Sequence, residues 1–368
     1  MRLIDLGPGE LAADSPPIAI EAARRALAEG DTRYTAVDGP PVLRRAIAER
    51  FAPVGAPWTG EGDTIVTVGA KGALFAAMQS LVGPGDKVVI PTPRWSTLAA
   101  QVELAGGQVI DAPTADRGFA LEAKTLLERV DDETIAVILN SPCNPTGAVM
   151  PADELEQLVA GCARRGVALL SDETYRDFYY PEPEESRRLA PSVAEFAAEY
   201  QDTVCLVSSV SKSYAMTGWR VGFALGPPVL ISAMRLIQGH LTSNATSFAM
   251  AGAAAALEAA QSNVESNVLA CARNRRLLLD ALEDGPLTVL RPKGAFYAWV
   301  HTGTTESTAD LARRLLEESR VVVVPGEAFG APGHLRISLA AGAEDLREGL
   351  ERLRQALDRS PHFAPVSG

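Results

Sequence analysis

The sequence predicts an α/β protein with a large domain built on a mostly parallel sheet and a smaller α+β domain. The first observation is length, because 368 residues are more than one ordinary core holds. The second is the alternation of short apolar runs with helical patterns between residues 64 and 227. The third is a change after about residue 228, where a long helical region leads into shorter strands. Strands that alternate with helices favour a parallel sheet covered on both faces.

The elements of the large domain follow from apolar runs of strand length. These runs span residues 64–69, 87–93, 107–113, 134–140, 167–172, 203–209 and 221–227. Helical stretches lie between several of them, at 71–82, 96–106 and 151–166. The last stretch begins with Pro151 and an acidic first turn and ends with two arginines and Gly166, which is the order expected of a capped helix.

The C-terminal part has the pattern of the smaller domain. After the helical region at about 228–284, the sequence predicts strands at 297–300, 321–324 and 335–340 and a final amphipathic helix at 343–357. We expect residues 27–261 to form the large domain. We expect residues 1–26 and 262–368 to form a discontinuous small domain, which the N-terminal arm joins.

Composition and charge exclude several classes of function. The chain is 47% hydrophobic and 22% charged, which is typical of a folded protein, and its formal net charge is −12. An acidic chain has no electrostatic reason to bind nucleic acid or an anionic membrane. No apolar stretch is long enough for a signal peptide or a membrane span. We therefore expect a cytoplasmic protein with small-molecule partners.

The four cysteines indicate neither a disulfide framework nor a metal site. They show no C-x-x-C pair and no histidine spacing typical of zinc, so we expect reduced cysteines and no bound metal. A catalytic thiol at Cys143 is the alternative, but the motif around it has a better explanation below. The four are Cys143, Cys162, Cys205 and Cys271.

Unusual residues follow the predicted strands, at the sheet edge where ligands bind in open parallel sheets. "TVGAKGAL" (67–74) is a small-residue turn that opens a helix, and its N–H groups suit a phosphate, although an ordinary turn would look the same. Asp172 comes at the end of another strand, where it is also a good helix N-cap. Lys212 follows a third strand, and a lysine away from water is costly unless it has a partner or a chemical role.

Together these residues point to pyridoxal 5'-phosphate as the cofactor. That cofactor requires a lysine that bonds to it, a carboxylate that pairs with its pyridinium nitrogen, and hydroxyls, N–H groups and an arginine around its phosphate. Lys212 supplies the lysine and Asp172 the carboxylate, and the turn in "TVGAKGAL" supplies N–H groups for the phosphate. Arg220 is the arginine nearest to Lys212 along the chain.

The chain resembles the class I/II aminotransferases, which are pyridoxal-phosphate enzymes of fold type I, and within them the aspartate/aromatic-like subgroup. The resemblance runs from about residue 5 to 357 and includes several motifs in the family's order. These are "YTAVDGPPVLRRAIA", "TVGAKGAL", "SPCNPTGAV", "SDETYRDFYY", "SVSKSYAMTGWRVGF", "PKGAFYAWV" and "VVPGEAFGAPGHLRISLA".

The resemblance implies a catalytic role for Lys212, Asp172 and Tyr175, and a role in binding cofactor and substrate for Asn144. Lys212 matches the lysine that bonds to the cofactor and then moves a proton between substrate and cofactor. Asp172 matches the partner of the pyridinium nitrogen. Tyr175 and Asn144 match the pair that hydrogen-bonds the ring hydroxyl.

The resemblance also implies the rest of the binding site. Trp95 matches the aromatic residue that stacks on the cofactor ring, and Arg336 matches the arginine that binds the substrate α-carboxylate in a bidentate pair. Tyr34 matches a tyrosine that reaches the phosphate of a neighbouring subunit, which implies a homodimer with shared active sites. The residues that match the phosphate site are Gly69, Ala70, Lys71, Ser209 and Arg220.

The reaction that the resemblance implies is transfer of an amino group from an L-amino acid to a 2-oxo acid by a ping-pong mechanism. The alternative is another reaction of the same cofactor on an amino acid, as in β-lyases, cyclases, oxidases and decarboxylases. A DNA-binding regulator is disfavoured because no helix-turn-helix pattern precedes residue 34. Lys71 could also meet an acidic substrate side chain. Related enzymes imply cis peptide bonds at Asn144–Pro145 and Thr92–Pro93.

Overall fold

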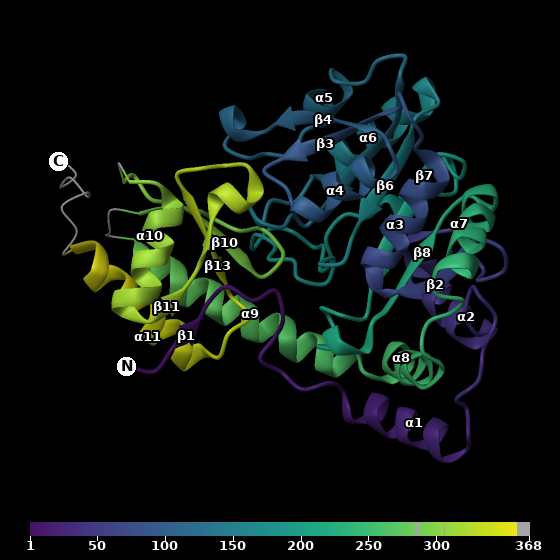
Figure 1. Ribbon diagram of the computed structural model, residues 1–368, viewed down its shortest axis with the longest axis horizontal. Helices are drawn as coiled ribbons and strands as arrows, with labels where there is room; N and C mark the ends of the chain where they lie inside the picture. Colours follow the sequence, from purple (N-terminus) through teal and green to yellow (C-terminus); the bar gives the residue numbers. More distant parts are fainter. Residues whose placement is uncertain (284–286, 305, 359–368) are drawn as a thin grey trace.

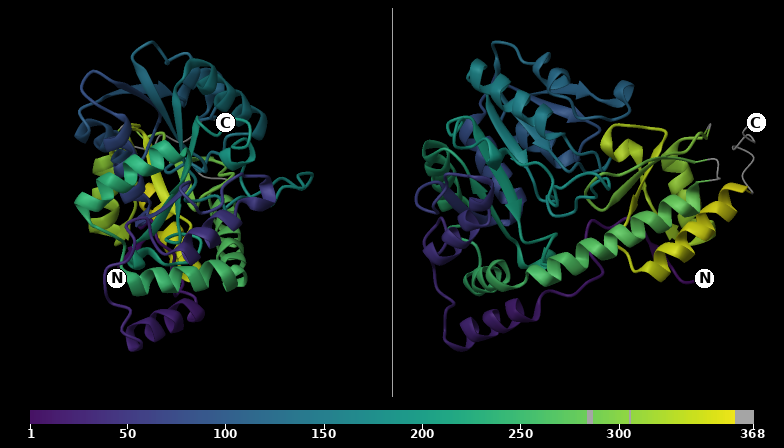
Figure 2. Two further views of the ribbon diagram at one scale, coloured as in Figure 1. Left: turned by 90° about the vertical axis from the view of Figure 1, so that its right-hand side faces the viewer. Right: turned by 180° about the vertical axis from the view of Figure 1, so that it is seen from behind.

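Two bodies of the chain, each built on its own sheet, are joined by the long helix α9 (Gln261–Leu282) (Figure 1). In the computed structural model, the residues described are 1–283, 287–304 and 306–358. Seen from behind, α9 starts beside α8 of the large body and runs along to the small one (Figure 2). The predicted end of the helical region at 284 and the last residues of the small domain, 359–368, lie outside the described residues.

The large body holds the predicted, mostly parallel sheet. Its seven strands have the order β2-β8-β7-β6-β5-β3-β4, and every neighbouring pair is parallel except the two pairs that β8 makes with β2 and β7. The strands are β2 (Thr64–Val68), β3 (Lys87–Thr92), β4 (Gln108–Pro113), β5 (Thr134–Asn140), β6 (Ala168–Asp172), β7 (Val204–Ser209) and β8 (Val221–Leu225).

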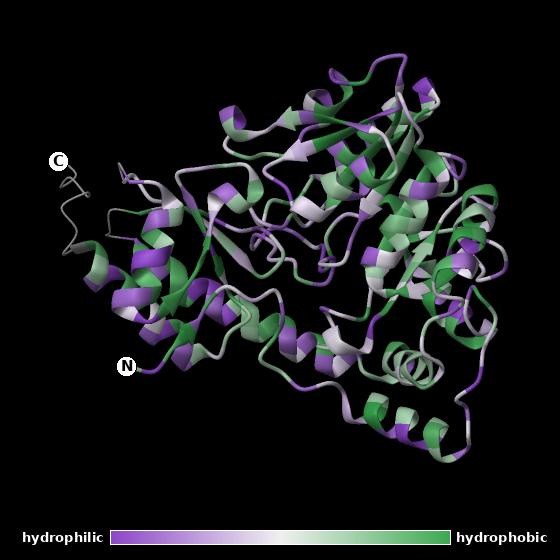
Figure 3. Ribbon diagram, viewed as in Figure 1, coloured by the Kyte–Doolittle hydropathy of each residue, from purple (hydrophilic) through white to green (hydrophobic). Residues whose placement is uncertain are grey.

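Helices cover both faces of this sheet, which explains the continuous apolar runs. In β5, Val137 and Leu139 belong to one core, whereas Ile138 between them belongs to the other. Both faces of the strand are therefore dry, and Figure 3 shows the strands of this body as hydrophobic along most of their length. One face packs against α3 (Gly69–Leu81), α4 (Ser96–Leu104) and α7 (Pro228–Leu241), and the other against α2 (Pro41–Glu49), α6 (Ala152–Arg165) and α8 (Ser247–Ala259).

The small body contains an antiparallel sheet and a short parallel pair. The sheet has the order β12-β13-β10-β9, and β1 (Ile4–Asp5) from the N-terminus pairs in parallel with β11. The remaining strands are β9 (Thr288–Leu290), β10 (Tyr297–His301), β11 (Val321–Val322), β12 (Val324–Pro325) and β13 (His334–Ser338), and the helices are α10 (Thr308–Arg314) and α11 (Ala343–Asp358).

One predicted strand, 321–324, is divided between these two sheets. Its first half is β11, which pairs with β1, and its second half is β12, which pairs with β13. The chain changes partner at Val323, which is buried in the core of the small body. The prediction of one continuous strand was wrong because an apolar run does not reveal which strands it will meet.

Several short elements were not predicted, and they bear on the domain boundary. They are β1, α1 (Pro17–Ala28), α2, α5 (Ala123–Leu127), β9 and α10. Helix α1 packs against α8 of the large body, whereas β1 pairs within the small one. A boundary at residue 26 would cut α1, so we propose that the large domain begins before this helix. None of the described helices is long and apolar enough to cross a membrane.

Candidate active site

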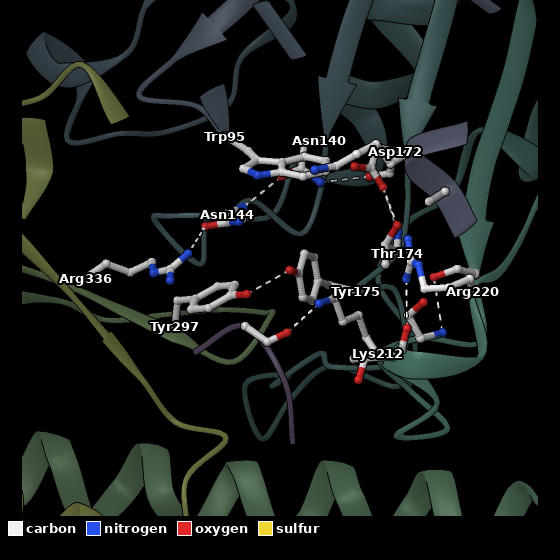
Figure 4. A pocket seen from close by; sticks show the side chains of 16 residues that line it. Trp95, Asn140, Asn144, Asp172, Thr174, Tyr175, Lys212, Arg220, Tyr297 and Arg336 are labelled. Carbon is white, nitrogen blue, oxygen red and sulfur yellow. Dashed lines mark hydrogen bonds between the residues drawn. The ribbon is translucent and has the colours of Figure 1, made fainter. Parts of the chain in front are cut away.

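The residues predicted at the strand ends converge on one cavity of about 380 Å³ between the two bodies (Figure 4). Its walls come from the loops that follow β5, β6 and β7, the start of α3, the N-terminal segment and β13. The predicted site residues that line the cavity are Ala70, Lys71, Trp95, Asn144, Asp172, Tyr175, Ser209, Lys212, Arg220 and Arg336.

Lys212 lies in a tight turn that follows β7. Its Nζ donates a hydrogen bond to the backbone carbonyl of Gly9, which places the N-terminal segment directly over the amine. Burial lowers the pKa of Lys212 to about 8, with Glu10 acting in the opposite direction and Arg220 adding to the fall. A larger fraction of this amine is therefore neutral near pH 7 than for an exposed lysine, which suits a nucleophile and a proton carrier.

Asp172 ends β6 and is almost fully buried, with 3% of its surface exposed. Its Oδ1 accepts hydrogen bonds from the backbone N–H of Thr174 at 3.1 Å and from the Thr174 hydroxyl at 2.5 Å. Burial raises the pKa of Asp172, and these hydrogen bonds only partly oppose the rise. Among the described residues no cation lies within ion-pair distance of it. The carboxylate therefore suits a cation held in the cavity, such as a protonated ring nitrogen.

The loop after β5 brings Asn144 into the cavity. Asn140, the last residue of β5, accepts a hydrogen bond of 2.8 Å from the backbone N–H of Asn144 and donates one of 3.1 Å to the carbonyl of Asp172. The amide of Asn140 thus ties two neighbouring strand ends together. The predicted cis bonds at Asn144–Pro145 and Thr92–Pro93 are confirmed, and Ser141–Pro142 is also cis, which was not predicted.

The start of α3 forms a cradle for an anion. A Cβ atom on Gly69 would lie 2.4 Å from Nη2 of Arg220, and one on Gly222 would lie 2.2 Å from the backbone nitrogen of Ala70. Only glycine permits this approach, which holds the guanidinium against the first turn of the helix. Nη1 of Arg220 donates to the carbonyl of Thr217 at 2.8 Å. A guanidinium beside the N–H groups of a helix start suits a phosphate.

Arg336 is held above the opposite side of the cavity by aromatic rings. Its guanidinium carbon lies 4.3 Å from the centre of the Tyr297 ring and 5.0 Å from that of Phe329. Its Nη1 donates to Oδ1 of Asn144 at 2.9 Å, and its Nη2 donates to the carbonyl of Gly7 at 2.6 Å. Its Nε has no partner among the described residues. This buried guanidinium can bind a carboxylate in place of these weaker acceptors.

Two of the predicted site residues, Tyr34 and Gly69, do not line the cavity, and a third, Lys71, lines it and also contacts Trp95. Tyr34 is 88% exposed and does not line the cavity. Gly69 does not line it either but packs beneath Arg220. Lys71 lies at the cavity with its Nζ 4.9 Å from the centre of the Trp95 ring. Arg94, next to Trp95, pairs with Asp111 at 2.6 Å and does not line the cavity.

Sequence reasoning missed several residues that line the cavity. The most prominent is Tyr297, whose hydroxyl lies 2.8 Å from that of Tyr175 and whose ring contacts Arg336. Tyr297 stands in "PKGAFYAWV", a motif that carried the resemblance without a role for this residue. Asn140 directly precedes "SPCNPTG", so its place at the end of a buried strand was a usable signal. Gly9, Thr174, Ser211 and Thr217 complete the set that was missed.

Known proteins of one family match this chain over almost its whole length. The model of the family aminotransferase class I and II matches residues 2–353. A probable aspartate/prephenate aminotransferase of Aquifex aeolicus is 36% identical, and the alignment covers 97% of this chain and 91% of that protein. The structure of an aspartate aminotransferase from Thermus thermophilus with maleate is 37% identical, with a TM-score of 0.89 over 96% of this chain and 92% of that one. An aromatic aminotransferase from Pyrococcus horikoshii is 35% identical, with a TM-score of 0.91 over 97% and 96% of the two chains.

Proposed function

The chain belongs to the class I and II aminotransferases, and we propose that its amino donor is a dicarboxylic amino acid of the aspartate type. It is a pyridoxal-phosphate-dependent enzyme that moves an amino group from an L-amino acid to a 2-oxo acid. The fold is that of the solved aspartate and aromatic aminotransferases, which are pyridoxal-phosphate enzymes of fold type I. The donor class and the roles of the individual residues rest on the contacts within the cavity.

We assign the proton transfer to Lys212. When bound, pyridoxal phosphate supplies an electron sink for the electron pair that a substrate leaves on its Cα when that carbon loses a proton. Lys212, with its pKa of about 8, can take up that proton and return it to the neighbouring carbon. Asp172 would keep the ring nitrogen protonated, because a buried carboxylate that forms no ion pair within the described residues stabilises a positive charge at that point.

The remaining cofactor contacts divide between its ring and its phosphate. Asn144 and Tyr175 would hydrogen-bond the ring hydroxyl, and Trp95 would cover one face of the ring. Arg220 and Ser209 would hold the phosphate, together with the backbone N–H groups at the start of α3. The support for this division is that all of these residues line one cavity, with Arg220 at one end and Arg336 at the other.

Arg336 would bind the substrate α-carboxylate. Two of its nitrogens already hold oxygen acceptors, Oδ1 of Asn144 and the carbonyl of Gly7. A carboxylate would replace neutral acceptors by a charged one, and such bonds contribute about 1.5–3 kcal/mol each. The rings of Tyr297 and Phe329 pack against the guanidinium and limit its motion, so that it is already aimed when substrate arrives.

Lys71 is the observation that supports a second carboxylate on the substrate. Its amine stands over Trp95 at the cavity, and within the described residues it has no carboxylate at ion-pair distance. A cation left unpaired beside the cofactor ring suits an anionic substrate side chain. The relatives agree in kind, since one is named for aspartate and was solved with maleate, a four-carbon dicarboxylate.

The test compares donors in Lys71→Met and wild type. We expect kcat/KM for aspartate and glutamate to fall by about 10–100-fold, because one charge-assisted hydrogen bond is lost, while kcat/KM for alanine changes by less than about threefold. Arg94→Met is a matched control, since Arg94 is paired with Asp111 and lies outside the cavity lining. Equal losses of kcat/KM for aspartate and alanine would show that Lys71 does not recognise the substrate side chain. Aromatic amino acids would then be the next donors to test, because one relative is named an aromatic aminotransferase.

We further propose a cytoplasmic homodimer. Tyr34 is exposed in the loop between α1 and α2, and other large apolar side chains are also exposed on α1 and α7, as expected of a surface that a second copy covers. These are Ile18, Ile20, Leu27, Leu236 and Leu241. The four cysteines are unpaired, which suits a reducing compartment.

A further inference from the structure

A buried ion pair lies beneath the turn that contains Lys212. Nη2 of Arg50 lies 2.5 and 2.7 Å from the two carboxylate oxygens of Asp177. Arg50 directly follows α2, and Asp177 lies in the segment after β6. Their side chains are 19% and 8% exposed, and neither residue lines the cofactor cavity.

The pair holds the two residues that follow Lys212. The hydroxyl of Ser213 donates a hydrogen bond to Oδ2 of Asp177. Nη1 of Arg50 donates one of 3.0 Å to the hydroxyl of Tyr214, which is 2% exposed. From α9, Asn267 donates its amide to the carbonyl of Ser213 at 3.0 Å. Three separate elements therefore fix the turn from the side away from the cavity.

Stability alone is a poor explanation for this pair. Two charges that leave water lose their hydration, and well-packed apolar residues often replace a buried ion pair without loss of stability. Burial lowers the pKa of Arg50, but Asp177 and Tyr214 more than compensate and the pKa ends above its usual value, so the charge is kept. What apolar side chains would not provide is directional hydrogen bonds to Ser213 and Tyr214.

We propose that Arg50 and Asp177 are positioning residues that fix the backbone of the turn so that Nζ of Lys212 faces the reacting carbon of the cofactor. On its own, the amine is held by one hydrogen bond, to the carbonyl of Gly9 in the N-terminal segment. The orientation of the long lysine side chain therefore depends on the backbone from which it starts. This proposal rests on the proposed role of the cofactor but does not depend on which amino acid is the donor. It therefore still stands if aspartate is not the donor.

The test separates binding of the cofactor from its capture by the lysine. In capture, Nζ condenses with the cofactor aldehyde, a C=N bond forms and one water leaves. Apoprotein is mixed with pyridoxal phosphate, binding is followed by quenching of tryptophan fluorescence, and capture is followed by the visible absorbance and by the fraction trapped with borohydride. Asp177→Asn keeps the size of the side chain and removes its charge.

We expect Asp177→Asn to slow capture by about 10–100-fold, as for a reacting group displaced by about 1 Å, while the amount of bound cofactor stays within about twofold of wild type. Glu306→Gln is the matched control. Glu306 forms an ion pair of similar burial with Arg314 at α10, in the small body, and this change should alter neither quantity. Capture at the wild-type rate, or binding and capture lost in the same proportion, would overturn the proposal.

Two variants that each remove a single hydrogen bond test the proposal if Asp177→Asn does not fold. Ser213→Ala and Tyr214→Phe each remove one hydrogen bond of the turn and leave the ion pair in place. Each should slow capture by about 2–10-fold, less than Asp177→Asn, because the ion pair and the other hydrogen bond still hold the turn, and neither should change the amount of cofactor bound. Wild-type capture in both variants would contradict the positioning role.

Discussion

Nη1 of Arg336 donates a hydrogen bond of 2.9 Å to Oδ1 of Asn144, although 192 positions separate the two residues in the chain. Arg336 lies on β13 of the small body, and Asn144 lies in the loop after β5 of the large one. Nη2 of the same guanidinium donates to Gly7 in the N-terminal segment. One side chain thus joins three segments at the cavity, and its position depends on how the two bodies meet.

Replacing Arg336 should therefore affect substrate and leave the cofactor in place. Arg336→Lys keeps the positive charge but loses the planar fork that holds two oxygens at once, so we expect kcat/KM to fall about 100-fold for every amino donor. Steady-state kinetics with several donors and a spectroscopic titration of the cofactor measure the two effects. An unchanged KM with reduced cofactor affinity would place Arg336 with the cofactor instead.

The pH dependence of cofactor capture should report the lowered pKa of Lys212. The neutral amine is the nucleophile, so the capture rate of the apoprotein should rise with pH and level off around the pKa of about 8, and not near 10.4 as for an exposed lysine. Glu10→Gln removes a carboxylate that raises this pKa, so its profile should move to lower pH. Lys212→Ala should capture no cofactor at any pH, and residual capture would mean that another amine reacts.

Asp172→Asn should retain the cofactor and lose most of its turnover. A carboxylate holds the proton on the ring nitrogen and an amide does not, so we expect the half-reaction with an amino acid to slow by about 10²–10³-fold. Rapid mixing of the loaded enzyme with amino acid measures this rate. Asp172 also accepts two hydrogen bonds from Thr174, and near-normal turnover of the variant would reduce its role to that local turn.

Sequence patterns were sufficient for the large sheet because its strands, apart from the edge strand β4, are buried on both faces. Continuous apolar runs such as 134–140 are then local signals, and their ends agree with the structure within one or two residues. The division of 321–324 between two sheets was not predictable in the same way. It depends on the pairing of Val321 with Ile4, near the N-terminus, and of Val324 with Arg336 on β13, and nothing in the apolar run itself indicates this change of partner.

The same distinction applies to the site. Lys212 and Asp172 stand out in sequence because a charged residue at the end of a buried strand needs an explanation. Tyr297 does not stand out, since an aromatic residue in a buried strand is ordinary core until the hydroxyl of Tyr175 and the guanidinium of Arg336 are placed beside it. Tyr297 was therefore missed because its role depends on contacts between the two bodies.

Hybrid dimers provide a test of Tyr34. If Tyr34 serves the cofactor of a second copy, Tyr34→Phe should weaken cofactor binding by about tenfold, the effect of one hydrogen bond to a charged phosphate. Mixing Tyr34→Phe chains with Lys212→Ala chains would then create one complete site in each hybrid. Equilibrium dialysis should find wild-type affinity for that site, and sedimentation should find dimers. If the hybrids bind only with the affinity of the variant, Tyr34 acts within its own chain.

Glu173, the neighbour of Asp172, points into the core and not into the cavity. It accepts hydrogen bonds from the Ser171 hydroxyl at 3.0 Å and the Val193 backbone N–H at 2.9 Å, and Nε of Arg176 lies 4.0 Å from its other oxygen. Burial raises the pKa of Glu173 to about 7, and the contacts with Arg176 and these donors only partly oppose it. Burial also lowers the pKa of Arg176. For both partners, therefore, the loss of hydration outweighs their mutual attraction.

The stability of the apoprotein should consequently fall as pH rises through 7. The folded-state pKa of Glu173 lies above its unfolded value, so its contribution is fully present below about pH 4.3 and is lost as pH rises through the folded pKa. Glu173→Gln keeps an oxygen acceptor and carries no charge, so it should raise the free energy of unfolding by about 1–3 kcal/mol at pH 8 and by much less at pH 5.5. Urea unfolding at the two pH values measures the difference, and Glu128→Gln, which changes an exposed carboxylate, should show no such dependence. A gain of the same size at both pH values, or a loss at pH 8, would mean that the ionised pair with Arg176 stabilises the fold.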